Sequence, residues 1–171
     1  MSRARVVAAV AVVGLLGTGC GSGAPAAPAV GDASRVDMCT ILTDAELREL
    51  GAQVDTREKT DELGVVGCIW GGKPFTLRLE NNEDTVTEYR ERRDAPNFTH
   101  FRDNMVNGRD GVQFSVRTPD EQCVQLMDGG PVSLAVGVAK AFSREPVPLD
   151  PCAEALRIAE MIEPRLPKAG T

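Results

Sequence analysis

Four cysteines could cross-link this chain or hold a metal ion: Cys39, Cys68, Cys123 and Cys152. Zinc ligands usually come as pairs about two to four residues apart, and none of these cysteines has such a neighbour. An even number of cysteines is typical of disulfides in exported proteins. We therefore predict two disulfides and no metal site. Three pairings are possible, and the equal separations within Cys39–Cys68 and Cys123–Cys152 favour these two pairs.

Catalytic chemistry needs an acid, a base or a nucleophile, and no motif in the sequence brings these together. The single histidine, His100, lies in a polar stretch without a serine or free-cysteine motif beside it. Metal-binding, phosphate-binding and dinucleotide motifs are absent from the sequence. Carboxylates are plentiful, so a hydrolase using two of them is the least favoured alternative. We expect a protein that is not an enzyme and has no cofactor.

A fifth cysteine, Cys20, follows a basic start and an apolar run. The run has the length of a signal-peptide core, shorter than the about twenty residues of a membrane span. The stretch Leu15-Leu16-Gly17-Thr18-Gly19-Cys20 resembles the bacterial lipobox, although Gly17 stands where a branched residue is usual. We expect residues 1–19 to be a lipoprotein signal peptide and Cys20 to carry a lipid. The alternative is a soluble secreted protein cleaved near Gly19.

The rest of the chain divides into a linker and one domain. Residues 20–36 are rich in Gly, Ala and Pro, which is typical of a flexible linker. Residues 37–167 have the commonest size of a single domain, and 168–171 are expected to form a disordered tail. The net charge of −6 argues against nucleic acid as a partner and against adhesion to anionic lipid. The lipid on Cys20 would then make the membrane contact.

The domain alternates between helix and strand signals. Capping boxes at Thr43 and Thr85 predict two short helices, over 44–50 and from 85 to before Pro96. Asp150 and Pro151 open a third helix. Strand-forming residues predict a strand around 65–70, and alternating apolar residues predict strands around 75–79, 112–116, 124–126 and 132–138. We expect an α+β fold with a mostly antiparallel sheet of about five strands, packed with N-terminal and C-terminal helices.

Two local patterns bear on the interior. Phe98, Phe101 and Met105 recur at helix-like spacing and predict a segment that caps a core. One side of the last strand carries only small residues, so we expect a helix to lie closely against that side. These small residues are Ser133, Ala135, Gly137, Ala139 and Ala141.

Several segments together resemble a known family. They are the lipobox-like Cys20, the Pro/Ala linker, Cys39-Thr40-Ile41-Leu42-Thr43-Asp44-Ala45-Glu46-Leu47, Gly67-Cys68-Ile69-Trp70 and Asp150-Pro151-Cys152. In this order they resemble small secreted lipoproteins of actinobacteria that are catalogued as a domain of unknown function (DUF3558-like). The resemblance covers most of residues 36–167. It implies a surface-exposed lipoprotein, and no catalytic residue can be carried over from it.

These features favour a binding or accessory domain at the outer face of the cytoplasmic membrane, with an envelope protein or a ligand as its partner. The second hypothesis is a carrier with an apolar pocket for a lipid or small metabolite. Its pocket would be lined by Phe98, Phe101, Met105 and Met127.

Overall fold

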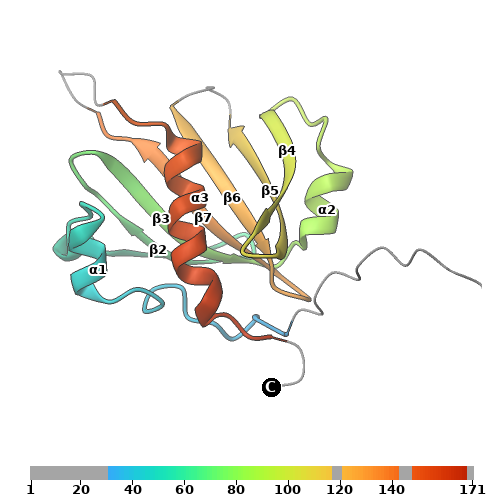
Figure 1. Cartoon of the computed structure of the whole chain (residues 1–171), viewed down its shortest axis with the longest axis horizontal. Coiled ribbons are helices and arrows are strands. Elements are labelled where there is room, and N and C mark those ends of the chain that lie inside the picture. The colour runs from blue at the N-terminus through green and yellow to red at the C-terminus, as the bar shows by residue number, and fades with distance from the viewer. Residues whose placement is uncertain (1–30, 117–120, 143–147, 169–171) are drawn as a thin grey trace, which may run out of the picture.

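The computed structural model describes residues 31–116, 121–142 and 148–168, which form one sheet with a long helix across it (Figure 1). The predicted signal peptide, Cys20 and the tail after Lys168 lie outside the described residues. Ala33, which belongs to the predicted linker, is fully buried, and its backbone N–H donates to the carbonyl of Gly129. Within the described part of the chain no helix is long and apolar enough to cross a membrane.

The sheet is antiparallel throughout and has seven strands, not about five. Across the sheet they run in the order β1 (Glu58–Glu62), β2 (Val65–Trp70), β3 (Phe75–Asn82), β7 (Ser133–Lys140), β6 (Gln122–Asp128), β5 (Arg109–Val116) and β4 (Phe98–Val106). The two strands that the sequence did not predict, β1 and β4, are the two edges. An edge strand lacks one neighbour, so its sequence needs less apolar alternation than a central strand.

Neither edge strand shows a regular alternation of apolar residues, and the reason differs between the two. The β1 sequence, Glu-Lys-Thr-Asp-Glu, exposes residues on both faces and therefore shows no period of two. In β4 the register shifts between Thr99 and Arg102, where His100 adopts a positive φ of 53°. This irregularity shifts Phe98 and Phe101 out of the alternating pattern. The segment of Phe98, Phe101 and Met105, predicted to cap a core, is this edge strand: Phe98 and Phe101 pack on Phe114, whereas Met105 is 50% exposed.

The three predicted helices are confirmed, close to the predicted bounds. They are α1 (Asp44–Glu49), α2 (Val86–Glu91) and α3 (Pro151–Ile162). Short 3₁₀ turns lie at Val54–Thr56 and Glu163–Arg165. Both capping boxes are formed, because the hydroxyls of Thr43 and Thr85 each accept from the backbone N–H three residues on. These caps let two six-residue helices begin at defined positions.

The main core lies between the sheet and α3. From β7 it takes Leu134, Val136 and Val138, and from α3 it takes the stripe Ala155, Ile158, Ala159 and Ile162. The expectation that a helix covers the small residues of β7 holds only at Ala135, which the short helix α2 meets through Val86, because α3 lies on the opposite, large-residue face. Ala135, on the small-residue face, belongs instead to a second cluster with Val86, Val112, Phe114 and Leu126. This second cluster is where α2 meets the sheet.

Both disulfides attach outlying segments to the α3 face of the sheet. Cys39 pairs with Cys68 in β2, and Cys123 in β6 pairs with Cys152 in α3, with Cα–Cα distances of 5.1 and 5.0 Å. The favoured pairing is therefore confirmed, and the four thiols are not zinc ligands. Cys68 and Trp70 lie in the same core, and the Trp70 side chain is fully buried there.

Candidate ligand-binding groove

The face of the sheet opposite α3 carries a groove of about 590 Å³. Its floor is the strands themselves, and α2 with the segment leading into β4 forms one wall. The residues lining the groove come from all seven strands, α2 and two connecting segments: Thr60, Glu62, Leu63, Val65, Arg78, Glu80, Asn82, Tyr89, Arg92, Ala95, Asn97, Phe98, Phe114, Val116, Val124, Leu126 and Ala135. The helix that lines the groove is α2, which Figure 1 shows beside the β4 and β5 end of the sheet.

Small residues stand at the centre of the floor. Residues paired across antiparallel strands put their side chains on the same face. One such row runs Thr60, Gly67, Glu80, Ala135, Leu126, and a second runs Arg78, Gly137, Val124, Phe114. Ala135 lines the groove, and its short side chain leaves room above the floor. Gly67 and Gly137 add no space, because a Cβ at Gly67 would overlap the carbonyl oxygen of Leu79 and a Cβ at Gly137 would meet the Arg78 side chain at 3.2 Å. Of the small residues that were expected to seat a helix, Ala135 is the one that lines the groove.

The half of the groove near β5 and β6 is apolar and aromatic. The rings of Phe98 and Phe114 lie 4.5 Å apart, and Tyr89 of α2 stacks on Phe114 at 5.8 Å. Val124 and Leu126 extend this surface toward the centre of the sheet. Aromatic pairs at these separations pack favourably and make a rigid wall.

The half of the groove near β1, β2 and β3 is polar. Glu80 is 9% exposed, and burial raises the pKa of its carboxyl group, while the Arg78 guanidinium at 3.3 Å opposes that rise. Asn82 is 5% exposed, and its Nδ2 has no hydrogen-bond partner among the described residues. The Thr60 hydroxyl is buried and unpartnered in the same way. Buried polar atoms usually have a hydrogen-bond partner, so two unpartnered atoms in one groove need an explanation.

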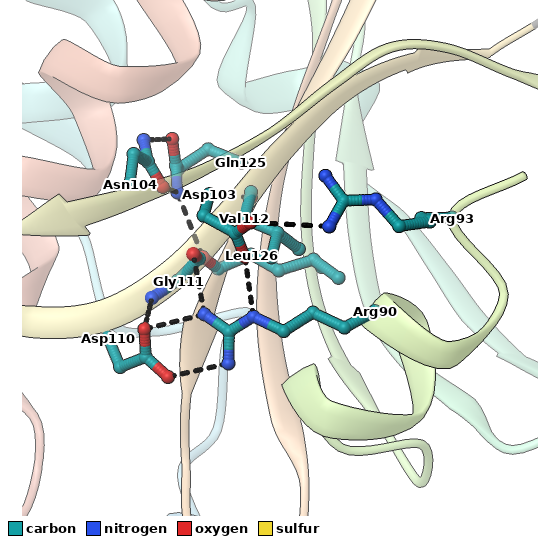
Figure 2. Close-up of polar contacts among 9 residues, drawn as sticks. All are labelled: Arg90, Arg93, Asp103, Asn104, Asp110, Gly111, Val112, Gln125 and Leu126. Carbon is teal, nitrogen blue, oxygen red and sulfur yellow. Dashed lines mark hydrogen bonds and ion pairs between the residues drawn. The ribbon is translucent and has the colours of Figure 1, made fainter.

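Helix α2 is held against β4 and β5 by one arginine. Arg90 donates from both terminal nitrogens to Asp110, at 2.8 and 2.6 Å, and from Nε to Asp103 at 2.6 Å (Figure 2). Hydrogen bonding to Asp110 raises the Arg90 pKa, and the bond from Arg90 lowers the Asp103 pKa. A bidentate pair of this kind fixes orientation as well as distance. The contacts of Arg90 with Asp103 and Asp110, here called the arginine clamp, therefore fix the position of α2, which carries Tyr89 in the groove wall.

Polar groups on the other face of β5 and β6 are fully engaged. Gln125 exchanges hydrogen bonds with Asn104 at 2.6 and 2.9 Å, as the upper part of Figure 2 shows. Gln113 donates to Gln125 at 3.2 Å and to the carbonyl of Cys152 at 2.9 Å. These amides join β4, β5 and β6 to the start of α3, so they explain the packing there and provide no reactive group.

The structure separates the residues that the carrier hypothesis placed together. Phe98 lines the groove, and Phe101 packs beside it on Phe114. Met127 is fully buried in the main core, on the opposite face, and Met105 is 50% exposed. Only Phe98 of the four predicted lining residues therefore lines the groove.

The sequence analysis missed the groove's polar residues. Arg78, Glu80 and Asn82 alternate with buried leucines along β3, a pattern that ordinarily indicates a solvent-facing side. His100, the single histidine, lies instead at a separate small hollow near the start of α3. Among the described residues no group of histidines, cysteines and carboxylates could hold a metal ion.

Comparison with known proteins gives one match. A family model described as a protein of unknown function (DUF3558) matches residues 16–165, which include the groove, both disulfides and Cys20. No curated protein and no solved structure matches the chain. Because the family model spans well over half of the sequence, the chain belongs to the DUF3558 family of unknown function.

Proposed function

We propose that this protein is a binding domain that holds a small amphipathic molecule in the groove on the open face of its sheet. The observation that carries the proposal is the groove itself: an apolar, aromatic half beside a polar half with two unpartnered buried polar atoms. Ligand sites in proteins are typically about 300–1,000 Å³, mostly apolar, with a few polar groups that fix orientation. The groove has this size and this division.

The setting we propose is the outer face of the cytoplasmic membrane. The signal-like residues 1–19 and the lipobox-like Cys20 support export and lipid attachment, and the two disulfides are what an oxidising compartment allows. The protein would then be an actinobacterial lipoprotein that binds its ligand beside the membrane. Cys20→Ser is expected to release the protein into the medium and to abolish lipid labelling. Unchanged membrane retention would contradict the anchor.

The chain offers two reporters for the groove, because it has one tyrosine and one tryptophan. Tyr89 lines the groove, whereas Trp70 is buried in the main core on the other face. Biosynthetic 3-fluorotyrosine and 5-fluorotryptophan therefore give one ¹⁹F signal for each face. We expect decyl-chain probes, kept below their micellar concentrations, to shift the Tyr89 signal and to leave the Trp70 signal in place.

A blocked groove supplies the control. Ala135→Leu places a larger side chain on the floor, so it is expected to abolish the probe-induced shift at Tyr89. The Trp70 signal of that variant should keep its native position, which shows that the core is intact. If no decyl-chain probe shifts Tyr89 in the native protein, the groove is not a ligand site and the proposal fails.

An envelope protein is the second candidate partner, and one surface feature favours it. Leu63 is 98% exposed at the turn between β1 and β2, with a positive φ of 52°, and it lies at the rim of the groove. A leucine held outward in a conformation that favours glycine is a candidate contact residue. A photocrosslinker at position 63 should recover one reproducible envelope protein if this candidate is right.

A further inference from the structure

The two arginines of the groove already have carboxylate partners. Arg92 donates to Asp84 at 2.6 Å and lies over the Tyr89 ring at 4.9 Å, and Arg78 pairs with Glu80 at 3.3 Å. A carboxylate or phosphate entering the groove would share one of these two arginines with a protein carboxylate that already balances its charge. Both arginine side chains are about half exposed, at 53% and 49%, and ion pairs in contact with water contribute little. Anionic ligands therefore gain little from the cations that line the groove.

A cationic ligand meets the same difficulty. The buried carboxylate, Glu80, is already held by Arg78, so an ammonium group would have to compete with that guanidinium. Glu62, the other carboxylate lining the groove, is exposed. An ammonium group beside Glu62 would keep its contact with water, where ion pairs contribute little.

The unsatisfied groups, by contrast, are uncharged. Three buried side-chain atoms lack a hydrogen-bond partner within the described residues, and two of them, Asn82 Nδ2 and Thr60 Oγ1, belong to groove residues. An amide nitrogen only donates, whereas a hydroxyl both donates and accepts. A carbonyl, ester or hydroxyl oxygen of a ligand would satisfy either group without bringing a charge out of water.

We propose that the ligand of the groove is an uncharged amphipathic molecule, whose ester, amide or hydroxyl oxygens are bound separately by Asn82 and Thr60 while its apolar body lies on Phe98, Phe114 and Leu126. This inference rests on the proposed function. It narrows the ligand class from any amphipathic molecule to neutral ones, such as an acylglycerol or an acyl amide.

Three probes with the same ten-carbon chain separate the head-group classes: 1-decanoylglycerol, decanoate and decylammonium. Their dissociation constants are read from the Tyr89 ¹⁹F signal of the full chain, purified without added lipid. The neutral ester is expected to bind about tenfold more tightly than either ion. Decanoate or decylammonium binding as tightly as the ester would overturn the inference, while the groove would stand as a ligand site. If none of the probes binds, the proposed function fails as well.

A pair of neighbouring asparagines tests the role of the amide. Asn82→Leu removes the unpartnered amide at nearly the same size, so it should weaken 1-decanoylglycerol about tenfold and leave decanoate unchanged. Asn81 is the matched control, because it points to the other face and donates to the carbonyl of Ala33 at 3.1 Å. Asn81→Leu should leave the affinity for the ester unchanged. An unaltered ester affinity in Asn82→Leu would contradict the inference.

Discussion

The two faces of the sheet treat buried polar groups in opposite ways. On the α3 face, Gln113 and Gln125 are fully hydrogen-bonded, and the buried guanidinium of Arg109 pairs with Glu163 at 3.1 Å. On the groove face, Asn82 and Thr60 each have a buried polar atom without a hydrogen-bond partner. The carboxyl group of Glu80 is also buried there, which raises its pKa. The indole nitrogen of Trp70 is the exception on the α3 face. Native cores satisfy their polar groups, so the departures gathered on one face indicate a surface shaped by something other than stability.

If the α3 face carries the stability, removing its covalent link should have the largest effect. The double substitution Cys123→Ser with Cys152→Ser frees α3 from β6 and is expected to lower the free energy of unfolding by about 2–5 kcal/mol. Urea unfolding followed by far-UV circular dichroism measures the change. A loss below about 1 kcal/mol would break the comparison, because α3 would then be held by packing alone.

Removing side-chain atoms should lower the free energy of unfolding more on the α3 face than on the groove face. Ile158→Ala removes a fully buried side chain and is expected to cost about 2–4 kcal/mol. Val124→Ala is made at the edge of an existing groove, where the side chain is only half-buried, so its cost should stay near 1 kcal/mol or below. The same urea titration compares the two variants. Equal costs would mean that the groove face is as tightly packed as the core.

The arginine clamp should matter to the wall of the groove as well as to stability. Arg90→Met removes the bonds to Asp103 and Asp110 and is expected to cost about 1–2 kcal/mol and to broaden the Tyr89 ¹⁹F signal. Arg93 is the matched control, because its longer contact with Asp103 is 3.6 Å. Arg93→Met should change neither quantity measurably. A sharp Tyr89 signal in Arg90→Met would show that α2 does not need the clamp.

Removing an unpartnered polar group should stabilise the ligand-free protein. Asn82→Leu replaces a buried amide that makes no bond through Nδ2 and is expected to raise the free energy of unfolding by about 1 kcal/mol. Asn81→Leu should lower it, because that amide is bonded to Ala33. Thermal unfolding of the two variants shows whether each substitution raises or lowers the stability of the fold. A less stable Asn82→Leu would show that the amide serves the fold.

Two carboxylates should give opposite pH dependences. Arg165 and the Thr43 cap lower the pKa of Glu46, in the first turn of α1, from 4.5 to about 2. Its contribution to stability is therefore present above pH 4.5 and lost as the pH falls toward about 2. Burial raises the pKa of Glu80, so its contribution is present below pH 4.5 and lost as the pH rises through the folded pKa. Urea titrations of Arg165→Met and Glu80→Gln across this range should separate the two trends, and parallel curves would contradict the assignment.

Much of the scaffold was predictable because its signals are local. The capping boxes at Thr43 and Thr85, the Asp150-Pro151 start and the alternation in four central strands each depend on neighbours within a few residues. The pairing of the cysteines was one of three possibilities, and their equal separations favoured the pairs that the structure shows. These features show in the sequence because short-range geometry requires them.

The groove was not predictable because its chemistry depends on pairings across five strands. Glu80 and Asn82 look like solvent-facing residues until β7 and β1 are placed beside β3. Ala135 and Gly137 were correctly recognised as a small-residue surface, but the sequence did not indicate on which face of the sheet α3 packs. The helix packs on the face with the large residues of β7, because its stripe of alanines and isoleucines buries more apolar area against those residues.

The position of the two disulfides has a consequence for how this protein can change over time. Cys68 and Cys123 both point to the α3 face, so neither cross-link touches the groove. Substitutions in the groove then leave the disulfides and the main core unchanged. Most of these variants should therefore stay stable enough to fold. Related chains could therefore share this framework and bind different molecules. The same property would let a library of groove variants be selected for new ligands.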